Sequence, residues 1–319
     1  MLILKYLIAI AALGLFNIAQ AINPTEGSYP NKVIHIFTSA AGGGNDLVAR
    51  LIGQSLTLSL SQSVIIENRT GIISVEQIAK STPDGYNLLV IGSSLWIDPL
   101  MSREARWDAL EDFSPITLAV TSPNVLVVHP SINVNSTRQL IALAKNQPGV
   151  LNYASAGSGS NPHIAAELFK YMAHVNIVRV IYKGTGQALN DILAGQCQIA
   201  FTPIGSVMSH IKSGKLQALA VTSLKPTSLY PDLPSISDSG LSGYEAVSTY
   251  GVFSPAKTPA SILQRLNVEI VKLLNESKIK DKLRASGSES VGTSPKVLTE
   301  RIRADILRFS KILKYDSGE

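Results

Sequence analysis

The chain has little of several residue types that mark particular classes of protein. Its 319 residues include one cysteine, Cys197, so no disulfide forms within the chain and the core must be stable without one. Cys197 lies in the apolar-rich stretch from Gln196 to Phe201, which predicts a buried small hydrophobic residue rather than a redox group. Aromatic residues are scarce at 6%, and no basic stripe is interleaved with them, so we expect no nucleic-acid partner.

The sequence also lacks the motifs of common enzyme classes. It has no G-x-S-x-G nucleophile elbow, no H-E-x-x-H metal motif and no paired cysteines, and its five histidines show no metal-ligand spacing. Its glycine-rich stretches lack the Lys-Ser/Thr ending of a phosphate-binding loop and the G-x-G-x-x-G register of a dinucleotide fold. We therefore expect no cofactor, no metal and no catalysis, with an exported α/β enzyme as the remaining alternative.

Long apolar runs are absent except at the N-terminus. Lys5 supplies a short basic start, Tyr6 to Phe16 form an apolar stretch, and Ala19-Gln20-Ala21 provides an A-x-A cleavage site. This pattern predicts a secretory signal peptide over residues 1–21, cleaved near Ala21, because the stretch is too short for a membrane span. A single anchoring helix is the alternative.

Charge gives a weaker indication. The formal net charge is +5, and +4 once Lys5 leaves with the predicted signal peptide, which would mildly attract acidic solutes. Basic residues gather only toward the C-terminus, where they alternate with acids such as Asp281, Glu300 and Asp305. That alternation is typical of a solvated helix face.

Two stretches of small residues are the most informative feature that is present. The first runs from Ser39 to Asp46 after strand-like residues 33–38, and the second runs from Ser155 to Pro162 after residues 150–154. Small residues let backbone N–H groups approach a ligand closely, and each following helix would place the positive end of its dipole behind them. The pair predicts two lobes that hold one anion between them, although either stretch alone could be only a tight turn.

Strand-like and helix-like patterns alternate from residue 33 onward, which is typical of an α/β fold. We expect mainly parallel sheets flanked by helices, with a first lobe over residues 22–124 and 247–319 and a second over residues 125–246. The main expected elements are strands at 33–38, 86–92, 151–154 and 177–182, helices at 46–60, 75–80, 258–275 and 295–314, and a helix capped by Asn161. The last helix presents an apolar face that should dock on the first lobe.

Short motifs follow one another along essentially the whole mature chain. They are Tyr29-Pro30, Ala40–Gly44 with Asp46 and Arg50, Glu67-Asn68-Arg69, Pro83–Tyr86, Asn124–Pro130, Leu151–Gly157, His163, Tyr182-Lys183-Gly184, Gly214–Leu216, Ala218–Ser223, Pro255-Ala256 and Thr258-Pro259. In this order they closely resemble the Bug (TctC-like) family of periplasmic solute receptors of tripartite tricarboxylate transporters.

The resemblance implies a two-lobed periplasmic-binding-protein fold, a "Venus flytrap" that closes on a small organic carboxylate. It implies delivery to membrane permease subunits of a tripartite tricarboxylate transporter, with a membrane sensor such as a sensor kinase as the alternative recipient, and we expect a monomer. The residues it implies at the ligand are Ala40, Ala41, Gly42, Gly43, Gly44, Asn45, Asp46, Ser93, Ser94, Ser155, Ala156, Gly157, Ser158, Gly159, Ser160, His163, Lys183, Gly184 and Thr202.

Three positions depart from the family pattern. The stretch from Thr70 to Ser74 is shorter and more apolar than the usual glycine-rich run, so that part of the cleft is expected to be lost or reshaped. Thr202-Pro203 stands where many members carry Asp-Asn, which removes a carboxylate suited to an amino-acid ammonium. Gln187 replaces a common proline. These changes leave the ligand's identity open and disfavour amino acids.

Several polar residues have more than one interpretation. Asp46 is either a helix-start residue favoured by the dipole or a ligand contact. His163 falls in the first turn of a helix, where packing is expected rather than general-base chemistry. Arg50 and Arg69 are expected to pair with nearby acids and hold the fold.

Overall fold

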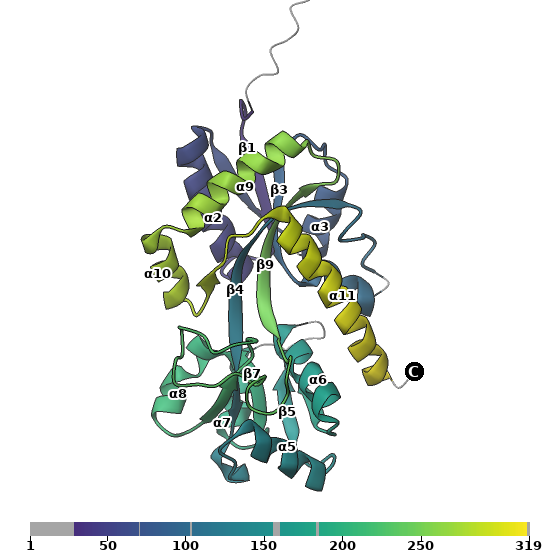
Figure 1. Cartoon of the computed structure of the whole chain (residues 1–319), viewed down its shortest axis with the longest axis vertical. Helices are drawn as coiled ribbons and strands as arrows, with labels where there is room; N and C mark the ends of the chain where they lie inside the picture. Colours follow the sequence, from purple (N-terminus) through teal and green to yellow (C-terminus); the bar gives the residue numbers. More distant parts are fainter. Residues whose placement is uncertain (1–28, 70, 103, 156–159, 183–184, 318–319) are drawn as a thin grey trace, which may run out of the picture.

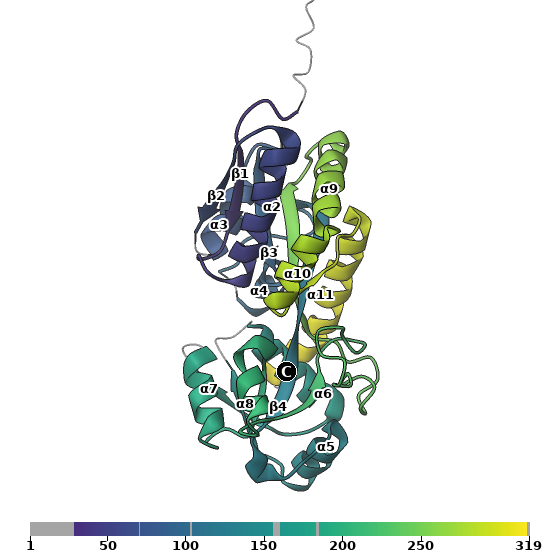
Figure 2. The same cartoon turned by 90° about the vertical axis from the view of Figure 1, so that its left-hand side faces the viewer.

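The computed structural model describes residues 29–69, 71–102, 104–155, 160–182 and 185–317, so the predicted signal peptide lies outside it. Two α/β lobes are stacked along the long axis and joined by long strands (Figures 1 and 2). Helices flank the sheet of each lobe, which confirms the predicted fold class. Within the described ranges, no helix combines the length and the apolar character needed to span a membrane.

Lobe 1 holds the N-terminal third of the chain and its C-terminal helices. Its strands are β1 (Ile34–Thr38), β2 (Val64–Asn68), β3 (Asn87–Gly92), β9 (Val247–Pro255) and β10 (Glu289–Ser290). Its helices are α2 (Gly44–Leu60), α3 (Gly71–Ala79), α4 (Ser94–Met101), α9 (Ala260–Leu274), α10 (Ser277–Ala285) and α11 (Pro295–Ser317). The order across the sheet is β2-β1-β3-β9-β4.

Lobe 2 is built from the middle of the chain. Its strands are β5 (Asn152–Ser155), β6 (Val178–Ile181), β7 (Ile199–Pro203) and β8 (Gln217–Val221). Its helices are α5 (Thr137–Asn146), α6 (Asn161–Ala173), α7 (Thr185–Leu193), α8 (Met208–Lys212) and the short 3-10 turns Pro130–Ile132 and Ile204–Ser206.

Strand β4 (Phe113–Val128) belongs to both sheets. Its first part pairs with β9 as far as Pro123, and from Asn124 onward it pairs with β7, joined by β8 from Val125. Proline has no backbone N–H to give to a ladder, and the Asn124 N–H donates to the Thr222 hydroxyl instead of to a strand (2.8 Å). The predicted lobe limits at 124/125 and 246/247 stay a proposal.

Among the described residues, three hydrophobic clusters hold the layers together. One lies between the sheet of lobe 1 and helices α2, α9 and α10, and another lies beneath α7 and α8 in lobe 2. The largest is continuous across both lobes: it includes Leu298, Ile302 and Phe309 of α11 together with Phe169 and Phe201 of lobe 2. Helix α11 therefore docks on lobe 1 as predicted and also reaches α6 of lobe 2 (Figure 1).

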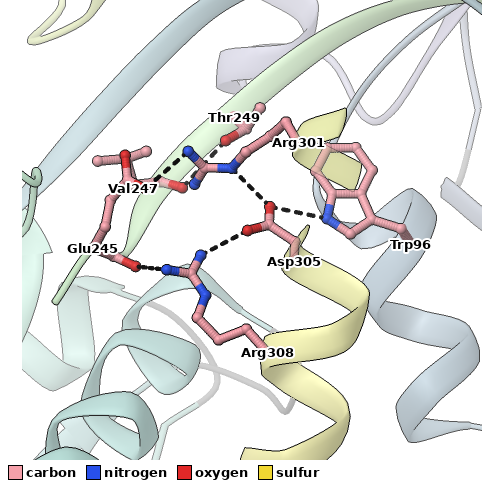
Figure 3. A network of polar contacts seen from close by, with 7 residues as sticks. All are labelled: Trp96, Glu245, Val247, Thr249, Arg301, Asp305 and Arg308. Atoms are coloured by element: carbon pink, nitrogen blue, oxygen red, sulfur yellow. Dashed lines mark hydrogen bonds and ion pairs between the residues drawn. The ribbon is translucent and has the colours of Figure 1, made fainter. Parts of the chain in front are cut away.

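A buried network of charged residues holds α11 in place where the two lobes meet (Figure 3). The carboxylate of Asp305, 3% exposed, accepts from Arg301 at 3.0 Å, from Arg308 at 2.6 Å and from the Trp96 indole at 3.2 Å. Arg301 also pairs with the Glu245 carboxylate (3.0 Å), and Arg308 donates to the Glu245 carbonyl (2.9 Å). The network thus connects α11 with α4 and with the segment that enters β9.

The structure corrects three details of the sequence analysis. Helix α2 begins at Gly44 rather than Asp46, so Gly44 and Asn45 belong to its first turn. Helix α3 begins at Gly71, so most of the apolar stretch expected to be a loop is helical. The N-cap of α6 is Ser160 rather than Asn161. Cys197 is buried, as predicted, at 1% exposure.

We expect Asp305→Ala to lower the free energy of unfolding by about 3 kcal/mol, because it leaves two partly buried guanidinium groups without their carboxylate. The matched control on the same helix is Glu300→Ala, whose pair with Lys296 is solvent-exposed and should contribute less than about 1 kcal/mol. Urea denaturation followed by circular dichroism measures both, and equal small losses would contradict a structural role for the network.

Candidate functional site

Strand directions make the carboxyl ends of the two sheets face each other. β1, β2 and β3 run parallel, and β9 is antiparallel to both β3 and β4, so these three strands share the direction of β4. β7 is antiparallel to β4, and β5 and β6 run parallel to β7. Because β4 runs from lobe 1 into lobe 2, the two sets of strands point toward one another. Ligands of α/β sheets bind outside the carboxyl ends of the strands, so the candidate site lies between these edges.

Helices begin directly after these strands on both sides. α2 and α4 follow β1 and β3 in lobe 1, while α6 and α7 follow β5 and β6 in lobe 2. The first N–H groups of a helix have no acceptor within it, and its dipole is positive at that end. The N–H groups at these helix starts and the positive ends of the helix dipoles are therefore directed at the space between the lobes, which favours an anionic ligand.

The two predicted ligand loops are called the first pincer (Ala40 to Asp46) and the second pincer (Ser155 to Ser160). Asp46 organises the first of them. Its buried carboxylate accepts from the Gly42 N–H (2.9 Å), from Arg50 Nε (3.0 Å) and from Asn68 Nδ2 (2.8 Å). Asn68 Nδ2 also donates to the Ser39 carbonyl (2.8 Å). Asn68 therefore holds the loop through a hydrogen bond at its start, Ser39, and at its end, Asp46. The hydrogen bond from Arg50, followed by those from Gly42 and Asn68, lowers the pKa of Asp46 to about 2 despite its burial. Asp46 therefore holds the loop as a carboxylate.

The small residues that lead into α2 are solvent-exposed: Ala40, Ala41, Gly42 and Gly43, and Gly44 as the first residue of the helix. A Cβ at Gly44 would lie 2.3 Å from the Tyr250 hydroxyl oxygen, so the ring of this β9 residue packs directly against the helix start. Burial raises the pKa of Tyr250, whose hydroxyl stays neutral at physiological pH. Gly44 is thus required for close packing, whereas a Cβ at Gly43 would meet only the Ala40 carbonyl oxygen, at 3.8 Å.

The polar side chains at these helix starts are only partly satisfied. Asn45 Nδ2 donates to the Ser39 hydroxyl (2.9 Å). Within the described ranges, the buried Oδ1 of Asn45 and the buried hydroxyl oxygen of Ser160 have no hydrogen-bond partner. Ser93 is the N-cap of α4 and Ser94 its first residue, both half-buried at the end of β3. Donor and acceptor positions for a polar ligand are therefore present in both lobes.

The second predicted pincer is described in part. Ser155 ends β5 at 1% exposure and Ser160 caps α6, while the predicted ligand residues Ala156, Gly157, Ser158 and Gly159 lie outside the described residues, as do Lys183 and Gly184. His163, in the first turn of α6, is 1% exposed, in keeping with the packing role expected for it.

Thr202 lies in β7 at 7% exposure. It borders a cavity of about 20 Å³, also lined by Ser155 and Pro162, which is large enough for about one water molecule. The structure thus places Thr202 beside Ser155 and Pro162, at a buried position near the carboxyl end of β7.

Strand β4, which we call the hinge strand because it joins the two lobes, is tied to the start of α6 through two asparagines. The amide nitrogen of Asn124, a buried residue at the point where β4 changes partners, donates to Oδ1 of Asn161 at the start of α6. Asn161 thereby bonds with the hinge instead of capping its own helix. The family-like motif that begins at Asn124 was noted in the sequence, but no local pattern indicated this partner.

Sequence reasoning missed three residues that the structure brings to this site: Asn68, Arg179 and Tyr250. Arg179 Nε donates to the Ser155 hydroxyl (2.8 Å) although 24 positions separate the two residues. Asn68 lay in a quoted motif, and its place at the end of a strand was the available signal. Arg50 and Arg69 pair with Asp46 and Glu67 (3.0 and 3.7 Å), which confirms the predicted pairing with nearby acids.

Known proteins resemble this chain over nearly its whole length. The family model described as "Tripartite tricarboxylate transporter family receptor" matches residues 48–316. Protein BugT of Bordetella pertussis is 30% identical over 313 residues, which cover 96% of each chain.

Two solved structures are similar as well. Rpa4515 of R. palustris with adipate has a TM-score of 0.75 and 32% identity, covering 90% of this chain and 97% of that one. MatC of Rhodopseudomonas palustris with bound malate has a TM-score of 0.70 and 25% identity, covering 89% and 99%. The matched family consists of periplasmic solute receptors rather than enzymes, which confirms the prediction that the chain is not an enzyme.

The lowered pKa of Asp46 predicts an acid-sensitive fold. A carboxylate with a pKa of about 2 when folded and 3.8 when unfolded stabilises the native state above pH 4, and this contribution is lost as pH falls from about 4 to about 2. Asp46→Asn should be less stable than the wild type at pH 7 and should lose less additional stability over that interval. Chemical denaturation at several pH values measures the difference, and identical pH profiles would contradict it.

Proposed function

This chain belongs to the tripartite tricarboxylate transporter receptor family, and from that premise we propose that it captures a small organic carboxylate between its lobes and delivers it to the membrane permease of such a transporter. The observation that carries the proposal is the facing pair of carboxyl edges, each with helix N-termini directed at the other lobe. Backbone N–H groups at such positions recognise anions without a cationic ligand residue.

The proposed contacts are complementary to a carboxylate. The Ser160 hydroxyl and the N–H groups at the starts of α2, α4 and α6 are donors for carboxylate oxygens. Asn45 Oδ1 is an acceptor and suits a ligand hydroxyl or a bridging water. The proposed ligand residues remain those predicted from the sequence, with Asp46 acting through the loop that it holds.

The energetics are sufficient for micromolar binding. A micromolar dissociation constant corresponds to about 8 kcal/mol. Hydrogen bonds to charged groups contribute about 1.5–3 kcal/mol each, and a helix terminus adds about 0.3–1 kcal/mol. Four or five such contacts from two lobes therefore supply the affinity. The ligand shifts the open–closed equilibrium by its greater affinity for the closed form.

The remaining parts of the proposal follow from the sequence. Residues 1–21 direct export to the periplasm and are removed near Ala21, after which the receptor acts as a monomer. Lobe 1 comprises residues 22–124 and 247–319, and lobe 2 comprises residues 125–246. The adipate and malate of the two related structures are both dicarboxylates, which makes small dicarboxylates the first ligand class to test.

Thermal unfolding of the mature protein against a panel of dicarboxylates, tricarboxylates, aromatic acids and amino acids tests this function. We expect a saturable rise in melting temperature with at least one acid, because a ligand that binds only the native state stabilises it. Amino acids should give smaller shifts. A panel without effect, on protein first unfolded and refolded to remove any copurified ligand, would contradict the proposal.

Gly43→Ala should weaken binding of the acid identified in that panel by about tenfold or more while leaving the melting temperature of the free protein nearly unchanged. The backbone of Gly43 has a φ of −88° and an added Cβ meets ordinary contact only, so the fold tolerates the methyl group while the ligand loses close approach to the N–H groups. Isothermal titration calorimetry measures the affinity, and an unchanged dissociation constant would contradict the loop as a ligand contact.

A further inference from the structure

Tyr250 lies on the lobe 1 side of the candidate site, although no sequence motif marked it. It belongs to β9, where it pairs with Gly92, the last residue of β3, and with Val120 of β4. Gly92 directly precedes Ser93, the N-cap of α4. Tyr250 is therefore placed at the carboxyl edge of the lobe 1 sheet, from which α2 and α4 both begin.

The phenol hydroxyl lies where a side chain of the first residue of α2 would start. A Cβ on Gly44 would be 2.3 Å from the Tyr250 hydroxyl oxygen and 2.7 Å from the ring carbon that carries it. The Cα–Cβ bond of a helical residue is tilted toward the helix N-terminus. The hydroxyl therefore lies beside the first turn of α2, where the N–H groups of Gly44, Asn45 and Asp46 have no acceptor within the helix.

The tyrosine ring is held in place while the backbone beside it is open. Tyr250 is half-buried and packs against the hydrophobic cluster between the lobe 1 sheet and α2, which also contains Val252, two residues further along β9. Gly44, by contrast, is solvent-exposed. A ligand oxygen that accepts from the N–H groups at the start of α2 is thus also next to the phenol.

The chemistry of this hydroxyl suits an anionic acceptor. Burial raises the pKa of Tyr250, so the group stays protonated at physiological pH and is able to donate. A hydrogen bond with the Ser248 side chain, two residues earlier on β9, lowers the same pKa, which is the effect of a donor to the phenol oxygen. With Ser248 as the donor, the hydrogen of the phenol is available to a ligand oxygen.

We propose that the Tyr250 hydroxyl contacts the bound acid directly and donates to a carboxylate oxygen that also accepts from the N–H groups at the start of α2. The inference rests on the proposed carboxylate-receptor function and adds a side-chain donor to its backbone donors. A hydrogen bond to an ionised acceptor is stronger than one to a neutral acceptor, so the phenol strengthens binding of a carboxylate without adding a positive charge.

Calorimetric titration with adipate, malate, succinate and citrate tests this contact, and the same comparison applies to any other acid of the thermal panel. Tyr250→Phe removes the hydroxyl and keeps the ring on Gly44. We expect it to weaken binding of each acid that the wild type binds by about tenfold or more, with little change in the melting temperature of the free protein.

The matched control is Tyr230→Phe. Tyr230 is also half-buried with a pKa raised by burial, but it lies in the connection between β8 and β9, outside the candidate site, and its variant should bind as the wild type does.

The outcomes separate this contact from the receptor function. Unchanged dissociation constants in Tyr250→Phe would overturn the inference and leave the carboxylate-receptor function intact. A loss of affinity accompanied by an equally large loss of stability in the free protein would also overturn it, because the hydroxyl would then act on the fold. A wild type that binds none of these acids and no other carboxylate would overturn the proposed function and the inference together.

Discussion

The direction of one shared strand is the constraint on which the rest of the structure depends. In lobe 1, β4 pairs antiparallel with β9 and so runs in the same direction as β1–β3, whereas in lobe 2 it runs opposite to β5–β7. That single reversal makes β1–β3 and β5–β7 point toward each other. Each helix that follows such a strand then begins at the interlobe face, so the positive ends of several helix dipoles are brought together without any charged ligand residue.

The same junction carries the contacts that restrain the lobes. Helix α11 packs on α4 and reaches α6, and Asp305 joins two arginines of α11 to Trp96 in the first turn of α4. Glu245 connects this network to the entrance of β9, next to Tyr244, whose hydroxyl donates to the Ala165 carbonyl in α6 (2.7 Å). The start of α4 is therefore connected to the segment that enters β9 through buried, hydrogen-bonded groups.

Much of the fold could be predicted because it depends on local patterns. Strand and helix periodicity, the Pro162 start of α6 and the apolar face of α11 each reflect residues close together in sequence. The errors also have a local cause. Ile72 and Ile73 follow a short strand, and nothing in their neighbourhood indicated that Gly71 would open a helix over the sheet. Asn161 is of a residue type that favours N-caps, but its side chain accepts from the hinge residue Asn124, 37 positions away, instead.

By itself, the sequence determined the alternating α/β architecture, the reliance on a core without disulfides and the two small-residue stretches that precede helices, since each follows from composition or short-range spacing. Only the tertiary structure decided what those stretches meet. The Asp46 carboxylate accepts from the Gly42 N–H of its own loop, and the Tyr250 ring packs against Gly44. Arg179 donates to the Ser155 hydroxyl. These pairings depend on strand register and lobe orientation, which are set by packing between residues that are distant in sequence.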